Sequence, residues 1–311
     1  MPLTVGVVGA GAMGREHARQ LRTLGVRTVI WSRSGADAAA VQLGAEPAAS
    51  FEALLAAADV VDITTPTTTH LALGLAAIAA GKQVICEKPL GRTAAEAQQL
   101  VDAASAAGLH LLPAHVVRWF PAYAQAKAAV SAGELGELQR LRFYRGGAHP
   151  TSPWFADRAQ SGGVVMDLMI HDLDQARWLA GEVVRVEATR DAGTREDGAA
   201  AGHPFESASV TLTHASGAIT RADGVWGPPS LVFATEFALV GSRGSREHST
   251  RSSLPGAHEA DSPYRAQLRD FLAAIETGAP VRVTAADAVA AVRLADAALE
   301  SIETGRPVEL G

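Results

Sequence analysis

Residues 3–14 read Leu-Thr-Val-Gly-Val-Val-Gly-Ala-Gly-Ala-Met-Gly, and a run typical of a helix follows over residues 15–24. Residues 3–8 are an apolar stretch of strand type. A strand, the pattern GxGxxG and a helix in this order predict the first turn of a dinucleotide-binding βαβ unit.

The glycines of this turn each meet a physical need of phosphate binding. Gly9 permits the tight bend, Gly11 lets the backbone approach a pyrophosphate, and Gly14 lets helix and strand pack closely. Backbone N–H groups at the helix start then face the phosphates. We therefore expect Gly9, Gly11, Ala12, Met13 and Gly14 to bind the cofactor. A purely structural turn is the alternative, since the chain has 30 glycines.

The composition is that of a globular chain, because 48% of its 311 residues are hydrophobic and 19% are charged. This length predicts two domains. The net charge is −6 and no stretch is rich in Lys or Arg, so we expect no nucleic-acid partner. The longest apolar stretch, Leu71–Ala80, is too short for a membrane span, which needs ~20 residues.

Cys86 is the single cysteine, which excludes an intrachain disulfide and suits a reducing compartment. Its context, Gln-Val-Ile-Cys, is typical of a buried strand, so we expect it to pack in the core. The first strand begins at residue 3, which leaves no room for a leader peptide. These features predict a cytoplasmic protein.

Strands and helices alternate through the first part of the chain, which predicts a doubly wound parallel sheet covered on both faces, a Rossmann domain over residues 1–118. The rhythm then changes to consecutive strands with short connections. This change predicts an α+β domain over residues 119–311 with an open, mainly antiparallel sheet. Residues 191–204 have no periodicity, and we expect an exposed loop there.

Lys88 follows the predicted strand 83–86 within Glu87-Lys88-Pro89. Ligands of open α/β sheets bind outside the carboxyl ends of the strands, so Lys88 is placed to hold a substrate oxygen and stabilise developing negative charge. A solvated surface lysine is the alternative interpretation.

Asp167, His171 and Asp174 are spaced i, i+4, i+7 in a predicted helix and share one face, while Asp172 points elsewhere. An imidazole with a carboxylate one turn away on either side suits a general base. A polar stripe facing water is the alternative, although the apolar neighbours favour burial.

Thr64-Thr65-Pro66 ends another predicted strand, and His70 follows three more threonines. Such residues cap a helix or contact a cofactor phosphate or ribose, and a cap or turn role is the better interpretation for His70. The chain has no CxxC, HExxH, GxSxG or Walker A pattern, so we expect no metal site, serine nucleophile or P-loop.

These motifs together resemble the Gfo/Idh/MocA oxidoreductase family over nearly the whole chain. The matching pieces are the glycine turn, Thr65-Pro66 with His70, Glu87-Lys88-Pro89, Arg118-Trp-Phe-Pro121, Gly162-Gly163 with Asp167-x-x-x-His171-x-x-Asp174, and Thr304-Gly-Arg-Pro307.

The resemblance implies that Lys88 contacts nicotinamide and substrate, that His171 is the acid/base with Asp167 as its partner, and that the Lys88–Pro89 bond is cis. It also places Thr65, Pro66, His70 and Glu87 among the cofactor-binding residues. Candidate substrate-binding residues are Asp174, Arg118, His149 and Trp154, the last two in the substrate-loop region 148–155.

The end of the second predicted strand bears on the choice of cofactor. NAD-selective sites place Asp or Glu about 20 residues beyond the glycine turn, but this chain has Ser32, Arg33 and Ser34 there, and the first acid is Asp37. Hydroxyls and a guanidinium suit a 2′-phosphate. We therefore expect NADP, with NAD possible.

The motifs predict an NAD(P)-dependent oxidoreductase acting on a secondary alcohol or ketone of a sugar, polyol or related compound. The alternatives are a cofactor-binding regulatory or sensor protein, and a lyase or glycosidase that recycles its nicotinamide. We expect a homodimer or homotetramer through the C-terminal sheet, because its uncovered face would carry Leu, Val and Phe side chains.

Overall fold

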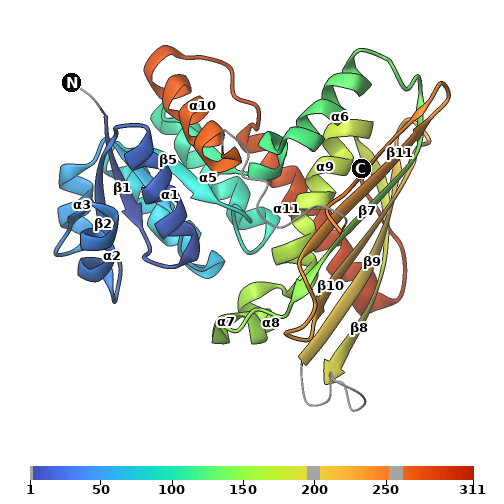
Figure 1. Cartoon of the computed structure of the whole chain (residues 1–311), viewed down its shortest axis with the longest axis horizontal. Coiled ribbons are helices and arrows are strands. Elements are labelled where there is room, and N and C mark those ends of the chain that lie inside the picture. Colours follow the sequence, from blue (N-terminus) through green and yellow to red (C-terminus); the bar gives the residue numbers. More distant parts are fainter. Residues whose placement is uncertain (1–2, 195–203, 252–261) are drawn as a thin grey trace. The chain divides into compact units, whose positions relative to one another are not determined.

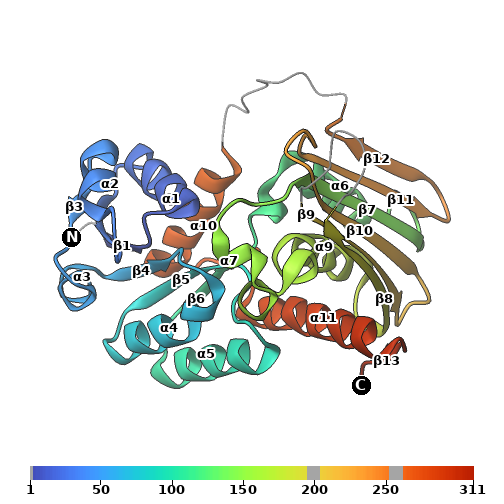
Figure 2. The same cartoon turned by 90° about the horizontal axis from the view of Figure 1, so that it is seen from below.

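The computed structural model describes residues 3–194, 204–251 and 262–311. The chain divides into two compact units, one formed by Met1–Trp119 with His258–Val289 and the other by Phe120–Ala257 with Ala290–Gly311 (Figures 1 and 2). The prediction assigned all residues after 118 to the second domain, whereas His258–Val289 belongs to the first unit.

The first unit contains a six-stranded sheet in the order β3-β2-β1-β4-β5-β6, with every pairing parallel. This topology confirms the predicted Rossmann sheet. The two-residue strand β3 was not predicted. The strands are β1 (Thr4–Val8), β2 (Arg27–Trp31), β3 (Glu46–Pro47), β4 (Val60–Ile63), β5 (Gln83–Glu87) and β6 (Leu111–Ala114).

Side-chain hydrogen bonds cap the starts of two helices in this unit. The Ser50 hydroxyl accepts the Ala53 N–H and the Thr93 hydroxyl accepts the Glu96 N–H, and each satisfies a donor at a helix start. The helices are α1 (Ala12–Thr23), α2 (Ala36–Leu43), α3 (Phe51–Ala57), α4 (His70–Ala79), α5 (Ala94–Ala107) and α10 (Pro263–Thr277), with the 3₁₀ turns η1 (Thr67–Thr69) and η2 (Val116–Trp119).

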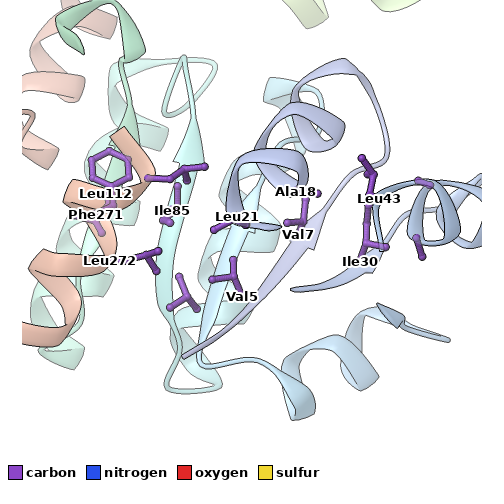
Figure 3. Packing of buried hydrophobic residues seen from close by; sticks show 14 of the residues in the cluster. Val5, Val7, Ala18, Leu21, Ile30, Leu43, Ile85, Leu112, Phe271 and Leu272 are labelled. Atoms are coloured by element: carbon purple, nitrogen blue, oxygen red, sulfur yellow. The ribbon is translucent and has the colours of Figure 1, made fainter. Parts of the chain in front are cut away.

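Helix α10 packs against α1 and η2, although it follows most of the second unit in sequence. Figure 3 shows Phe271 and Leu272 of α10 beside Ile85 and Leu112 in the core of the first unit. Phe271 meets the Trp119 ring edge-on at 5.5 Å, and the Trp119 indole N–H donates to Asp270 at 2.7 Å. Apolar side chains from the early part of the chain and from α10 are therefore buried together in one core.

The second unit contains a seven-stranded sheet in the order β12-β11-β7-β10-β9-β8-β13. Strands β7 and β10 pair in parallel and the other neighbours are antiparallel, which confirms the mainly antiparallel expectation. The strands are β7 (Leu138–Ala148), β8 (Val183–Thr194), β9 (Pro204–His214), β10 (Ile219–Gly227), β11 (Ala234–Gly241), β12 (Ser245–Ser249) and β13 (Val308–Glu309).

Helix α9 packs on β7 and β10 of this sheet. Helix α6 has the same length as α9, whereas α7 and α8 are short, and α11 begins in the first unit and continues into the second. The helices are α6 (Pro121–Ser131), α7 (Pro153–Ala156), α8 (Arg158–Ser161), the π-helical turn η3 (Val165–Met169), α9 (Ile170–Ala180) and α11 (Ala285–Thr304).

Two expectations for this unit are corrected. Residues 191–194 extend β8 and Pro204 begins β9, so only residues 195–203 of the expected loop lie outside the described residues. The apolar side chains of β7, such as Leu141 and Phe143, are buried, while the alternate positions Arg140 and Arg142 are exposed.

The exposed positions of the sheet are therefore largely polar and not the apolar surface that we expected. Arg140 and Arg142 on β7 are flanked by Arg221 and by the half-buried Asp223 of β10. The large apolar residues exposed on the strands are Val184, Ile219 and Val240. The homo-oligomer stays a prediction, without the apolar-face argument that first supported it.

Phe271→Ala should lower the free energy of unfolding by about 3–5 kcal/mol, because it opens a cavity where the ring joins α10 to the core of the first unit. Phe233→Ala is the matched control, since Phe233 is 59% exposed and its removal should change stability by about 0.5 kcal/mol or less. Denaturant unfolding of both variants checks this, and equal effects would contradict the assigned role of α10.

Candidate active site

The turn between β1 and α1 has the geometry that a dinucleotide phosphate needs. Gly9 has φ +116° and its N–H donates to the Trp31 carbonyl at 2.8 Å. A Cβ on Gly14 would lie 1.9 Å from the Gly9 carbonyl oxygen, so only glycine allows this approach. A Cβ on Gly11 would meet nothing within 4 Å, and Gly11 brings no side-chain acceptor to the start of α1. Open backbone at a helix start fits a pyrophosphate.

The loop after β2 lies next to this turn, because β1 and β2 pair in parallel with Val8 opposite Trp31. Ser32 is half-buried there, and Arg33 and Ser34 are exposed. Arg15 also belongs to this turn although no sequence motif points to it, because its Nε donates to the Ala10 carbonyl at 3.0 Å.

The loop after β4 is fastened to the glycine turn and to the end of β5. The Thr64 hydroxyl donates to the Val8 carbonyl at 2.9 Å. The two ring nitrogens of His70 lie 2.9 Å from the Pro89 carbonyl oxygen and 2.8 Å from that of Thr65. Burial lowers the pKa of His70 despite these carbonyls. His70 therefore holds two loops together, as the cap or turn interpretation predicts.

Lys88 directly follows β5, and the Lys88–Pro89 bond is cis as expected. The Lys88 side chain is half-buried, and its backbone N–H donates to Glu87 Oε2 at 3.0 Å. Glu87 is only 5% exposed and its carboxylate faces inward, so we drop Glu87 from the residues expected to touch a cofactor.

A row of buried ionisable groups, which the motifs did not predict, adjoins Lys88 through Glu87. His17 Nδ1 lies 2.9 Å from Asp62 Oδ2, and Nε2 lies 3.2 Å from Glu87 Oε1. Burial alone would lower the pKa of His17, but the charges and hydrogen bonds of Asp62 and Glu87 outweigh it and raise the pKa from 6.5 to about 10. Glu87 has a lowered pKa, because contact with His17 outweighs burial.

In the second unit, Asp167 lies in the π-helical turn η3, and His171 and Asp174 lie in α9. Asp167 and His171 are half-buried and Asp174 is 2% exposed. The predicted helix is therefore present, but it begins with a wider turn that a sequence pattern of period 3.6 does not reveal.

A glycine on β10 and an ion pair with β7 support this helical segment. A Cβ on Gly224 of β10 would lie 2.3 Å from Met169 Cγ, so glycine lets the Met169 side chain pack against the strand. Asp172 faces the sheet and takes two hydrogen bonds from the Arg145 guanidinium of β7, at 3.0 and 2.9 Å. Asp172, which the spacing predicts to point away from the face shared by Asp167, His171 and Asp174, thus contacts a strand of the sheet.

His149 lines a cavity of about 510 Å³ within the second unit, together with Phe155, Arg158 and the buried Glu206. Its ring lies 5.2 Å from that of Trp226. Trp154 stacks on Phe155 at 4.0 Å. The region 148–155 thus combines aromatic and polar groups, and its role as a substrate loop stays a prediction.

Arg118 is placed differently from its predicted role. Its guanidinium is 1% exposed, donates to the Arg282 carbonyl at 2.9 Å and lies 3.2 Å from the Asp287 carboxylate. These contacts hold η2 in the first unit and lend no support to substrate binding, so we leave Arg118 out of the proposed site.

The structure describes residues 3–194, 204–251 and 262–311. No helix in them is long and apolar enough to cross a membrane, and no group of three or more His, Cys, Asp or Glu side chains could hold a metal ion. Cys86 is buried as predicted, and burial raises the pKa of its thiol.

Comparison with known families matches residues 3–115 to an oxidoreductase family with an NAD-binding Rossmann fold and residues 123–247 to the GFO/IDH/MocA C-terminal domain. The chain belongs to the GFO/IDH/MocA family. It is therefore an oxidoreductase acting on CH–OH groups, with an NAD-binding Rossmann domain.

Several relatives cover nearly the whole chain. Myo-inositol dehydrogenase Hyg17 of Streptomyces leeuwenhoekii is 32% identical, covering 97% of this chain and 98% of the relative. The rhizopine catabolism protein MocA of Rhizobium meliloti is 31% identical, covering 95% and 94%. The solved structure of GenD2 from gentamicin A biosynthesis, in complex with NAD, has a TM-score of 0.86 at 28% identity, covering 100% and 97%.

The buried His17 should make stability depend on pH. Its folded pKa is raised, so its contribution is complete below about pH 6.5 and is lost as pH rises through about 10. The difference in melting temperature between wild type and His17→Gln should therefore be largest near pH 6 and shrink toward pH 10. A difference that stays constant over this range would contradict a buried imidazolium.

Proposed function

We propose that this enzyme oxidises a secondary alcohol of an inositol, sugar or related polyol to the ketone, or runs the reverse reduction. The observation that carries the proposal is Lys88 at the carboxyl end of β5, on the same edge of the parallel sheet as the glycine turn after β1, in a chain that also carries Asp167 and His171. Relatives named inositol dehydrogenase across nearly the full length support the substrate class.

The chain offers the groups that hold the cofactor when it is bound. Backbone N–H groups at Gly11, Ala12 and Met13 fit the pyrophosphate, and the loops after β2 and β4 flank them. The bound nicotinamide supplies the hydride acceptor or donor.

The remaining roles belong to side chains of this chain. Lys88 binds the substrate oxygen and stabilises the negative charge that develops on it during oxidation. His171 accepts the hydroxyl proton, and Asp167 orients the imidazole and stabilises its cation. Asp174 positions a neighbouring hydroxyl, and His149 and Trp154 shape the substrate loop.

His171→Asn and Lys88→Ala should each lower kcat by about 10²-fold or more with little change in cofactor affinity, because the groups act on the reacting oxygen and its proton. Absorbance of reduced nicotinamide across inositols, sugars and keto-sugars measures turnover, and a dehydrogenase consumes cofactor stoichiometrically. Lys82→Ala is the matched control, because Lys82 directly precedes the other end of the same strand. Near-normal turnover of His171→Asn at neutral pH would show that the assigned base is wrong.

We further propose that NADP(H) binds more tightly than NAD(H). Ser32, Arg33 and Ser34 support this, since they put a guanidinium and two hydroxyls after β2 where an acid would favour NAD. GenD2 was solved with NAD, so the preference has to be measured on this chain.

Arg33→Ala should weaken NADP(H) binding by roughly ten- to a hundredfold, the loss of one charge-assisted hydrogen bond of ~1.5–3 kcal/mol, and leave NAD(H) binding nearly unchanged. Arg27→Ala is the matched control, because Arg27 is exposed at the opposite end of β2 and pairs with Glu46. Isothermal titration of both cofactors measures the effect. Tighter NAD(H) binding by the wild type would contradict the preference.

A further inference from the structure

Three buried ionisable residues, Asp62, His17 and Glu87, form a row that connects three elements and ends next to Lys88. Asp62 lies in β4, His17 in α1 and Glu87 at the end of β5, and their exposed fractions are 0%, 0% and 5%. The His17 ring bridges the two carboxylates at 2.9 and 3.2 Å. A buried charge needs a partner, and here one imidazolium serves two.

The row reaches Lys88 through a single carboxylate. Glu87 Oε1 faces His17, while Glu87 Oε2 accepts the Lys88 backbone N–H at 3.0 Å. The Glu87 carboxylate therefore connects His17 to the backbone from which the Lys88 side chain extends.

Other ionisable groups face this row from the elements packed around it. The Tyr264 ring of α10 lies 6.3 Å from the His17 ring. Burial and the negative charges of Glu87 and Asp62 raise the pKa of the Cys86 thiol. His70 and Lys88 interact electrostatically with Glu87. His17 is the group that contacts both carboxylates directly.

Removing the imidazolium would leave two carboxylates in a dry interior. Like charges in such a setting favour protonation of one partner. A protonated Glu87 is a weaker acceptor for the Lys88 N–H than a carboxylate, because charge-assisted hydrogen bonds are the stronger ones.

We propose that His17 is a positioning residue for Lys88, because it keeps the Glu87 carboxylate ionised and oriented toward the Lys88 backbone. The catalytic part of this inference rests on the proposed function. The structural part concerns the first unit alone.

The lysines of this chain make the structural part directly measurable. They are Lys82, Lys88 and Lys127, so a protein labelled with ¹³C at the lysine ε position gives a small set of NMR signals that Lys→Arg variants assign. His17→Gln should shift the Lys88 signal and leave those of Lys82 and Lys127 in place.

His214→Gln is the matched control. His214 is also a buried histidine, but it contacts the Gly181 carbonyl and the Thr220 hydroxyl in the second unit. This variant should lose stability without moving the Lys88 signal. A folded His17→Gln protein with an unmoved Lys88 signal would overturn the proposal.

A charge-balanced variant separates positioning from simple loss of packing. His17→Gln combined with Asp62→Asn removes one positive and one negative charge, so Glu87 no longer has a second buried carboxylate beside it. The same NMR measurement can be made on this double variant if the single variant does not fold. Its Lys88 signal should differ from wild type, because Glu87 has lost its contact with His17, and an identical signal would overturn the proposal.

Kinetics give the second readout. His17→Gln should lower kcat roughly 10- to 100-fold with KM for the cofactor little changed. Its kcat should rise with pH as Glu87 loses its proton, and adding Asp62→Asn should move that rise to lower pH. A uniform loss without a pH-dependent step, unchanged by Asp62→Asn, would overturn the positioning role.

The two proposals fail in different ways. A wild type that turns over no polyol or sugar with either cofactor overturns the proposed function. The lysine spectra need no substrate, so they decide the position of Lys88 in that case as well.

Discussion

The close approach of α1 to the turn after β1 is the constraint on which the first unit depends. Gly14 lies so near the Gly9 carbonyl that any side chain would clash with it. This contact sets the start of α1, and one turn further along, the helix brings His17 between Asp62 and Glu87. The contact between Gly14 and Gly9 therefore affects both the open backbone at the start of α1 and the position of His17 between the two carboxylates.

In the second unit, contacts with the sheet hold the helix that carries His171 and Asp174. Helix α9 lies on β7 and β10, where Gly224 admits Met169 and Arg145 binds Asp172. A buried bidentate ion pair is costly to break, because removing one partner leaves an unpaired charge. The pair therefore opposes rotation of the helix, and with it a change in the direction of His171. The π-helical turn before it changes the pitch at Asp167.

The candidate site was predictable to the extent that its chemistry lies in short motifs. Lys88 after a strand, Asp167 and His171 on one helix, and the glycine turn all follow from spacing and turn chemistry. Arg118 and Glu87 were placed in the site by their motifs, yet the structure buries both in internal contacts. A motif identifies a segment, but the direction of each side chain depends on its neighbours in three dimensions.

The sequence by itself determined the alternation of strands and helices, the parallel sheet of the first unit and the mainly antiparallel sheet of the second. These properties follow from hydrophobic periodicity and from glycine or capping residues at element ends, which are local signals. Only the tertiary structure decided that α10 completes the first core, that His17 pairs with Asp62 and Glu87, and that the exposed positions of the second sheet are largely polar. Each of these depends on contacts between residues distant in sequence or on the face a strand presents, and no local pattern encodes which distant partner a buried group will meet.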